Sequence, residues 1–278
     1  MEDHVLWTYG WGKNESMPPY IKACHYTMRV NSGCKLVVVT PDNVNEYIKD
    51  LPTAFYDLIP PHQADIFRIN ILFQYGGMYL DGDTVVMQSL LPLFDLLDRV
   101  ELVGMNWKPY RLTQTEWQDL GVSIMGPMRP RLSFMLKVLQ KQRYLLIKKS
   151  LPLALSKKIK PFINYYPFKW EELLSPIVNS CLKENPPKSI IGDGASSWFS
   201  LVSGPNWDAG NLGYPLRQFD EINVLPETEL FTLANSMFPD DIKTASLEFI
   251  LSQNTILAKL LLKAMKIDGP GQLPTLDI

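Results

Sequence analysis

The chain has 278 residues, of which 46% are apolar and 20% are charged, and its formal net charge is −2. This composition is typical of a globular protein with a buried core, so it excludes a disordered chain, a collagen-like chain and a disulfide-stabilised miniprotein. A net charge so close to zero also argues against a chain that binds nucleic acid through its overall charge.

The cysteines and the N-terminus indicate the compartment. Cys24, Cys34 and Cys181 are far apart and form no CxxC pair, so neither a zinc knuckle nor a disulfide framework is expected. The first residues lack the basic start and apolar run of a signal peptide, and no apolar stretch reaches the roughly 20 residues that cross a bilayer. We therefore expect a cytoplasmic protein, with at most a peripheral place at a membrane surface.

Strand-like and helix-like segments alternate along the first half of the chain. In chain order we predict a strand at 5–9, a helix at 20–30, a β-branched strand at 35–40, a short helix at 43–49 and a helix at 63–75. Strands at 78–80, 84–87, 101–105 and 122–125 and a helix at 131–149 follow. Helices at 171–183 and 247–266 follow among loops rich in glycine and proline. The pattern predicts an α/β fold with a mostly parallel sheet and a helical, loop-rich C-terminal part, in one domain over residues 1–278.

One short motif carries most of the chemistry. Asp81-Gly82-Asp83 directly follows a predicted strand. Two carboxylates separated by a small residue at a strand end can point into one crevice, where a divalent cation relieves their repulsion. Oxygen ligands of this kind favour Mg²⁺ or Mn²⁺. The alternative is an ordinary surface turn rich in aspartate and glycine.

The helix before this motif contains an unusual charged pair. Asp65 and Arg68 are three residues apart and share one face of an otherwise apolar helix. They form either an internal salt bridge that joins helix to sheet, or a pair that binds sugar hydroxyls and phosphate oxygens. Gly76 and Gly77 end the helix and would bring the pair close to Asp81.

These residues together resemble a known family. Asp-x-x-Arg from Asp65, followed by Tyr-Gly-Gly-x-Tyr-x-Asp-x-Asp ending at Asp83, is similar to the donor site of DxD glycosyltransferases of the capsular-polysaccharide and yeast initiating-mannosyltransferase type. The same core is similar to that of the large clostridial toxin glucosyltransferases. The resemblance extends to residues 6–11, 18–20 and 39–48, and covers roughly residues 4–130.

The resemblance implies a GT-A fold, a UDP- or GDP-sugar donor, Mn²⁺ or Mg²⁺, and transfer to a glycan, glycoprotein or lipid-linked acceptor with retention of configuration. Carried over by position, Asp83 would bind the metal directly. Asp81 would bind the ribose or sugar of the donor, and the metal through water. Asp65 and Arg68 would hold the donor sugar.

The remaining roles also follow from the resemblance. Tyr79 would line the nucleotide pocket, and Trp7 or Tyr9 would stack on the base, although Trp7 also fits plain core packing. Residues 1–130 would form the donor-binding half and 131–278 the acceptor side, with a mobile donor lid around 192–208. The chain departs from many metal-dependent transferases of this fold because it has no histidine late in the sequence.

Two other functions fit parts of the sequence. Asp81-Gly-Asp-Thr-Val also matches the nucleophile motif of haloacid-dehalogenase-like phosphatases, with Asp240 and Asp241 as the later acidic pair. This interpretation leaves Asp65 and Arg68 unexplained. A sugar-nucleotide-binding protein without catalytic activity is the other alternative.

Basic residues gather in the second half of the chain. Residues 120–170 contain eleven lysines and arginines, all between Arg129 and Lys169, and no aspartate or glutamate. The helix 256–267 carries Lys259, Lys263 and Lys266 beside a run of apolar residues. These segments are either solvated faces or surfaces for phosphates and anionic lipids. We therefore expect a peripheral membrane contact through 129–169 and 256–267.

Overall fold

The structure is a computed structural model, which describes residues 4–12, 16–105, 120–159, 165–170, 172–192, 200–201, 216, 218, 230–233 and 238–276. The strands are β1 (Val5–Tyr9), β2 (Lys35–Val39), β3 (Gly77–Leu80), β4 (Thr84–Val86), β5 (Leu102–Met105), β6 (Ile124–Met128), β7 (Ser189–Gly192), β8 (Ser200–Leu201) and β9 (Leu230–Thr232). The α-helices are α1 (Pro19–Asn31), α2 (Val44–Tyr47), α3 (Pro60–Tyr75), α4 (Leu91–Asp95), α5 (Ser133–Ile159), α6 (Ser175–Glu184), α7 (Asp240–Thr244), α8 (Leu247–Ser252) and α9 (Ile256–Met265). Within these ranges, no helix combines the length and the apolar composition that crossing a bilayer requires.

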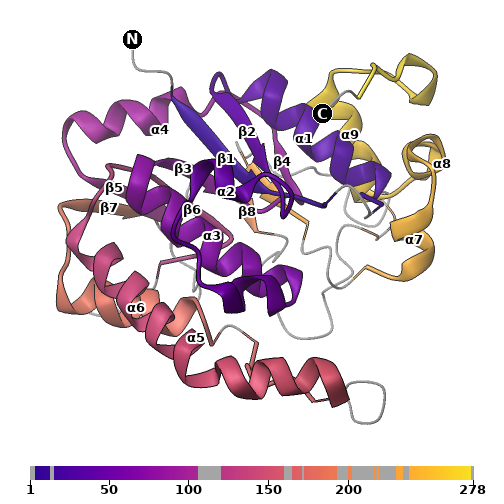
Figure 1. The fold of residues 1–278 in the computed structure, drawn as a ribbon. Coiled ribbons are helices and arrows are strands. Elements are labelled where there is room, and N and C mark those ends of the chain that lie inside the picture. Colours follow the sequence, from indigo (N-terminus) through magenta and orange to yellow (C-terminus); the bar gives the residue numbers. More distant parts are fainter. Residues whose placement is uncertain are drawn as a thin grey trace.

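A mixed sheet forms the centre of the fold (Figure 1). Among the described residues its six strands follow the order β2-β1-β3-β6-β5-β7. β1 pairs in parallel with β2 and β3, β5 pairs in parallel with β7, and β6 is antiparallel to both of its neighbours. All strands except β6 therefore run in one direction, which confirms the predicted α/β class with a mostly parallel sheet.

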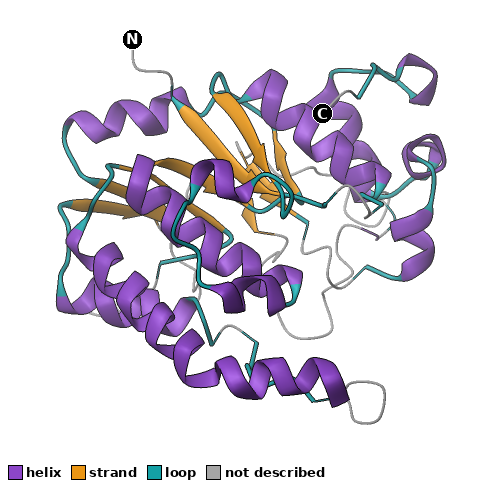
Figure 2. Ribbon diagram, viewed as in Figure 1, coloured by secondary structure: helices purple, strands orange, loops and turns teal. Residues whose placement is uncertain are grey.

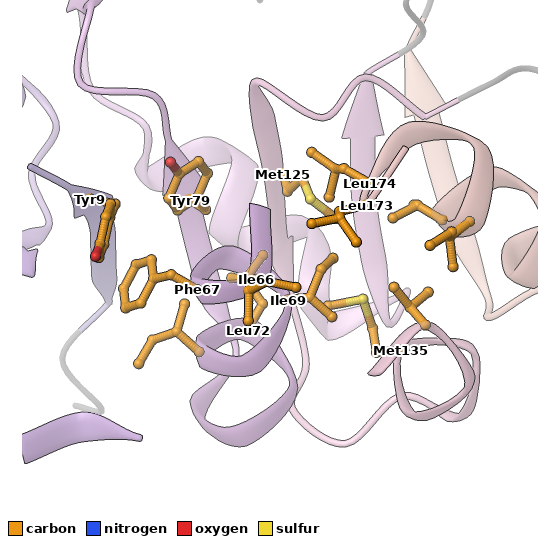
Figure 3. Close-up of a cluster of buried hydrophobic side chains, with 14 of the residues drawn as sticks. Tyr9, Ile66, Phe67, Ile69, Leu72, Tyr79, Met125, Met135, Leu173 and Leu174 are labelled. Atoms are coloured by element: carbon orange, nitrogen blue, oxygen red, sulfur yellow. The ribbon is translucent and has the colours of Figure 1, made fainter. Parts of the chain in front are cut away.

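Side chains alternate between the two faces of this sheet, and helices cover both faces (Figure 2). Trp7, Tyr9 and Tyr79 belong to the same buried cluster as the inner residues of α3, α5 and α6. Figure 3 shows Phe67 of α3 between Tyr9 and Tyr79. The neighbouring residue Leu6, with Met78 and Leu80 of β3, packs instead in the cluster that includes α4.

The glycines predicted to end α3 do so in the structure. Gly76 has φ +69° and Gly77 has φ +88°, a backbone region that L-residues rarely occupy. A Cβ on Gly77 would lie 2.7 Å from the carbonyl oxygen of Val5, so glycine also lets β3 approach β1. α3 begins at Pro60, three residues before the predicted start, because proline suits the first turn of a helix.

The C-terminal part differs from the prediction in three ways. The single helix predicted at 247–266 is wrong: it divides into α8 and α9, because Ser246 and Thr255 each cap a separate helix by accepting a backbone N–H. α5 continues to Ile159, ten residues beyond its predicted end. β7, β8 and β9 are not among the predicted strands. β7 joins the central sheet, and β8 and β9 form a second, three-stranded sheet with β4. The single domain and its division near residue 130 stay predictions.

Candidate active site

The two acids of the motif lie in the turn that joins β3 of the central sheet to β4 of the second sheet. The backbone N–H of Asp81 donates to the carbonyl of Ser123 (2.9 Å), and the N–H of Thr84 donates to the carbonyl of Asp81 (3.0 Å). On the other side, the N–H of Leu233 donates to the carbonyl of Asp83 (3.0 Å). Backbone contacts from both sheets therefore fix the position of the turn.

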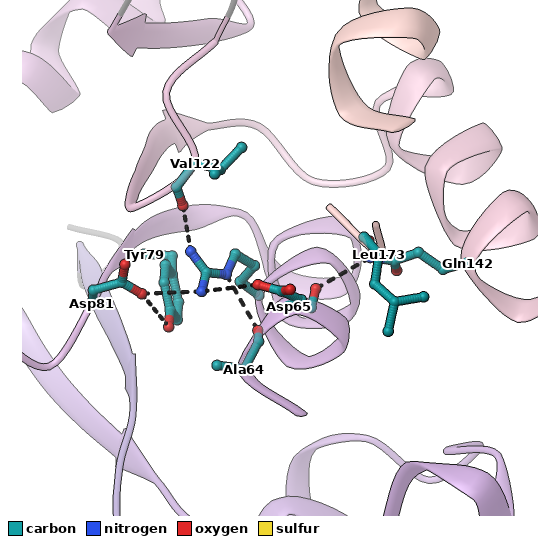
Figure 4. A network of polar contacts seen from close by, with 8 residues as sticks. Ala64, Asp65, Tyr79, Asp81, Val122, Gln142 and Leu173 are labelled. Carbon is teal, nitrogen blue, oxygen red and sulfur yellow. Dashed lines mark hydrogen bonds and ion pairs between the residues drawn. The ribbon is translucent and has the colours of Figure 1, made fainter. Parts of the chain in front are cut away.

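Arg68 is the centre of the polar contacts beside this turn (Figure 4). Its Nη2 atom lies 3.3 Å from Asp65 Oδ1, one turn earlier on α3, and 3.1 Å from Asp81 Oδ1. Its Nε donates to the carbonyl of Ala64 (3.3 Å), and its Nη1 donates to the carbonyl of Val122. The planar fork of donors thus joins α3, the end of β3 and the segment before β6. The expectation that Asp65 and Arg68 lie beside Asp81 is confirmed by these contacts.

The charged side chains of this network differ in burial, and Asp81 is partly exposed. The side chains of Arg68 and Asp65 are 6% and 11% exposed, whereas that of Asp81 is 31% exposed. Burial raises the pKa of Asp81 to about 6. Arg68 lowers this pKa and Asp83 raises it, but burial has the largest effect. Burial opposes the charge of Arg68, but Asp81 and Asp65 raise its pKa, so the guanidinium stays charged. Asp81 is therefore the carboxylate of this network that a ligand can reach.

Tyr79 orients the Asp81 carboxylate. Its hydroxyl donates to Asp81 Oδ1 (3.0 Å), and its ring lies under Arg68, whose Cζ is 4.5 Å from the ring centroid. Within the described residues, the side-chain contacts of Asp81 all use Oδ1. Oδ2 therefore remains available to a ligand.

Asp81 and Asp83 are the candidate ligands for a divalent cation, and this role stays a prediction. They lie close enough for Asp83 to raise the pKa of Asp81. Asp83 is 5% exposed and lies near Cys24 of α1. Burial raises the pKa of Cys24, and the charge of Asp83 raises it further. Two carboxylates that repel each other form a hard-oxygen donor set, and a cation would offset the repulsion. In the part of the chain that the structure describes, no group of three or more His, Cys, Asp or Glu residues is arranged to hold a metal ion.

A buried histidine explains the small residue between the two acids. A Cβ on Gly82 would lie 3.1 Å from His25 Nε2 and 3.4 Å from a ring carbon of Trp11. His25 is 1% exposed, and neither its ring nitrogens nor the hydroxyl of Thr8 has a hydrogen-bond partner among the described residues. Burial lowers the pKa of His25 to about 4, so a neutral ring packs against the motif. No sequence pattern indicates this contact, because His25 and Gly82 are far apart in the chain.

The two aromatic residues of β1 lie in the core. The Nε1 atom of Trp7 donates to the carbonyl of Gly76 (3.0 Å), and its ring packs against Tyr47 and Tyr75. This is the core packing that the sequence left open for Trp7. Tyr9 is 7% exposed, and its hydroxyl donates to Gln63 Oε1 (3.0 Å). Stacking of either ring on a nucleobase is not tested by these contacts and stays a prediction.

Two contributions to the site were missed because they come from elsewhere in the chain. The carbonyls of Val122 and Ser123 hold Arg68 and the backbone of Asp81. Gln142 of α5 donates from Nε2 to the carbonyls of Asp65 (3.2 Å) and Leu173 (2.6 Å), and so fixes α3 beneath the network. A polar residue on the apolar face of the predicted helix was the available signal for Gln142.

Other candidate segments lie apart from these contacts or outside the described residues. The side chain of Asp240 is 99% exposed and lies 3.7 Å from Lys243 Nζ, in the first turn of α7. The predicted lid around 192–208 is described only at Gly192, Ser200 and Leu201, so it stays a prediction.

Comparison with known proteins identifies the family. The family model described as "Capsular polysaccharide synthesis protein" matches residues 1–171. The chain belongs to this family. The match includes every residue of the Asp65–Arg68–Asp81 network and both acids of the motif, so the candidate site lies within the family's part of the chain.

Two curated relatives match short parts of this family member. An uncharacterized protein of Arabidopsis thaliana is 32% identical over 74 residues, which is 23% of this chain and 11% of the relative. The O-glycosyltransferase PaGT of Phomopsis amygdali is 28% identical over 114 residues, or 34% of this chain and 26% of the relative. The chain thus spans much less than two thirds of either relative.

Two solved structures of glycosyltransferases match the chain with low scores. The apo form of GlyE from Streptococcus pneumoniae matches with a TM-score of 0.47 at 14% identity, over 96% of this chain and 61% of GlyE. A mutant of LgtC matches with a TM-score of 0.42 at 10% identity, over 98% of both chains. At these scores and identities the similarities do not assign an activity.

Proposed function

We propose that the protein is a glycosyltransferase that moves a sugar from a UDP- or GDP-sugar donor to a glycan, glycoprotein or lipid-linked acceptor. The observation that carries this proposal is the Arg68 network, which links Asp65 to the partly exposed Asp81 at 3.3 and 3.1 Å. Membership of the capsular polysaccharide synthesis family supports it. A purely structural salt bridge would not explain why the side chain of Asp81, the partner of the buried Arg68, is 31% exposed.

The donor diphosphate and the cation belong to the same proposal. Asp81 and Asp83 would hold Mn²⁺ or Mg²⁺, which when bound stabilises negative charge on the leaving nucleoside diphosphate. Arg68 fixes the orientation of Asp81 and supplies positive charge beside it. Asp65 holds Arg68 in place, and its contact with sugar hydroxyls stays a prediction from the sequence. Tyr79 holds Asp81 through Oδ1, which leaves Oδ2 for the ligand. Retention of configuration and a cytoplasmic location remain predictions from the sequence.

The test is a panel of UDP- and GDP-sugars, with Mn²⁺ or Mg²⁺, in which release of the nucleoside diphosphate is measured. Donor binding is measured separately by thermal shift, because ligand at 100 times its Kd adds about 2.7 kcal/mol of stability. Asp83→Asn is expected to fold and to lose turnover, as is the wild type in excess EDTA.

Each alternative has its own outcome in this test. Release of phosphate from an aryl phosphate, without release of nucleoside diphosphate, would favour the phosphatase and contradict the proposal. Donor binding without turnover on any acceptor or on water would favour a binding protein. Full transferase activity of Asp83→Asn would refute the role of the motif.

A further inference from the structure

Among the described residues α5 is the longest helix, and the described segments cover only one of its faces. The inner residues of α5 are buried against α3, α6 and the short 3₁₀ helix Thr53–Asp57. These inner residues include Met135, Val138, Gln142, Leu146, Leu153 and Ser156. Figure 1 shows α5 along the lower edge of the molecule, with its C-terminal turns furthest from the sheet.

The opposite face of α5 carries a row of exposed apolar side chains. Tyr144, Ile147, Leu151 and Leu155 are 63%, 65%, 68% and 48% exposed. Their spacing of three, four and four residues places them one above another along the helix. We call these four residues the α5 outer row. Leu136, 45% exposed, lies two turns before Tyr144 on the same side.

Basic residues flank the α5 outer row on both sides. Arg143 precedes Tyr144 by one residue and Lys148 follows Ile147 by one, so at 3.6 residues per turn they lie on opposite sides of the row. Lys158 lies near its C-terminal end. Arg143, Lys148 and Lys158 are exposed, and no carboxylate of the described residues pairs with them.

The other lysines of this helix behave differently. Lys141 lies 3.2 Å from Glu184, Lys149 lies 2.6 Å from Glu172, and Lys157 lies 2.6 Å from Asp57. The acidic side chains that contact α5 are thus already neutralised. Within the part of the chain that the structure describes, the positive charge beside the α5 outer row has no carboxylate partner.

We propose that the α5 outer row, with Arg143, Lys148 and Lys158, docks the protein on a membrane surface that contains anionic lipid. An interfacial helix buries its apolar face at the level of the headgroups, while lysine and arginine extend their charged ends toward anionic headgroups. Charge complementarity selects this partner over a second copy of the chain. Two α5 faces related by a two-fold axis would bring the same basic residues together, because residues 120–170 contain no acid.

The structure also restricts the surface to one helix. The sequence predicts a second membrane element at 256–267, but the apolar residues of α9 pack in the core with α1 and α8. Asn31 of α1 donates to the carbonyl of Ala264 (2.8 Å), which holds α9 against the body of the protein. The apolar face of α9 is therefore not available to lipid. The α5 surface does not include Asp65, Arg68, Asp81 or Asp83, so it is independent of the proposed activity.

The experiment is co-sedimentation of the whole chain with vesicles, without nucleotide or metal. Neutral phosphatidylcholine vesicles are compared with vesicles that contain phosphatidylserine, at low and at physiological salt. We expect binding only to the anionic vesicles, and weaker binding at the higher salt because screening shortens the reach of the charges. The double variant Arg143→Gln/Lys148→Gln is expected to lower the partition coefficient by about 25-fold, since each basic residue contributes about fivefold.

Matched variants separate α5 from other surfaces. Ile147→Ser/Leu151→Ser should also lose binding, whereas Phe249→Ser, which removes an exposed ring from α8, should keep it. Lys259→Gln/Lys263→Gln removes the same charge from α9 and should keep binding. Thermal unfolding of every variant confirms that it folds.

Three results would overturn the proposal. The first is failure of the folded wild type to bind anionic vesicles. The second is an equal loss of binding when charge is removed from α9. The third is a wild-type dimer, seen by light scattering, that Ile147→Ser/Leu151→Ser converts to a monomer in the absence of vesicle binding. That third result would assign the α5 outer row to a second copy of the chain. None of these results depends on glycosyl transfer.

Discussion

Replacing Arg68 with methionine tests whether the guanidinium is the centre of the site. The side chain is 6% exposed and contacts Asp65 at 3.3 Å and Asp81 at 3.1 Å. Removing one partner of a buried ion pair costs about 3–5 kcal/mol, because a charge is left in a poorly solvated place. Asp81 is 31% exposed and can recover some hydration, so we expect a loss of about 3 kcal/mol for Arg68→Met.

Arg68→Lys is the matched control, because it keeps the charge and removes the planar fork. We expect it to lose about 1.5 kcal/mol, the contribution of one hydrogen bond to a charged group, and to weaken donor binding by much more than its stability loss explains. Stability is measured by urea unfolding at pH 7, followed by tryptophan fluorescence, with the m-value checked for constancy.

A double-mutant cycle with Asp81→Asn completes this test. If the ion pair carries the stabilisation, the two substitutions together cost clearly less than the sum of the single losses. Additive losses would refute the reasoning. So would a loss for Arg68→Lys as large as that for Arg68→Met, which would indicate packing and not charge.

Three further predictions concern the residues around the site. Gly77→Ala should lower the free energy of unfolding by more than about 2 kcal/mol. The φ of +88° is strained for alanine, and the new Cβ would meet the carbonyl oxygen of Val5. A loss below about 1 kcal/mol in urea unfolding would contradict this. Trp7→Phe should lower the free energy of unfolding by about 1–3 kcal/mol, because it removes the hydrogen bond to Gly76; an unchanged urea midpoint would contradict this. The pKa of His25 is about 4 in the folded protein and 6.5 in the unfolded chain, so its neutral form stabilises the fold above pH 6.5, and this stability is lost as the pH falls toward 4. His25→Leu should therefore gain up to about 3 kcal/mol relative to wild type between these pH values, and parallel pH profiles of the two proteins would exclude the effect.

Local patterns in the sequence were sufficient for most elements of the first half. The β-branched run at 35–39 and the glycine pair after α3 have physical effects that act within a few residues, so both are confirmed. The single helix predicted at 247–266 is wrong for a local reason. Ser246 and Thr255 are each capable of starting a helix, and two starts nine residues apart divide one apolar run into two helices.

Contacts between distant segments could not be predicted in the same way. The spacing of Asp65 and Arg68 predicted that they share a helix face, but not that Val122 and Asp81 would meet the same guanidinium. Trp7 was ambiguous because alternation along a strand says which residues share a face, and not whether a helix or a ligand covers it. The Nε1 contact with Gly76 depends on the pairing of β1 with β3.

The sequence by itself determined the α/β class, the order of most elements and the residues of the candidate site, because periodicity, capping and glycine placement are local properties of the chain. Only the tertiary structure decided that β4 leaves the central sheet, that Asp81 is more exposed than Asp65 and Arg68, and that α5 and not α9 presents an apolar face to solvent. The physical reason is that a helix or strand pattern defines two faces, whereas burial of one of them depends on which distant segment packs against it.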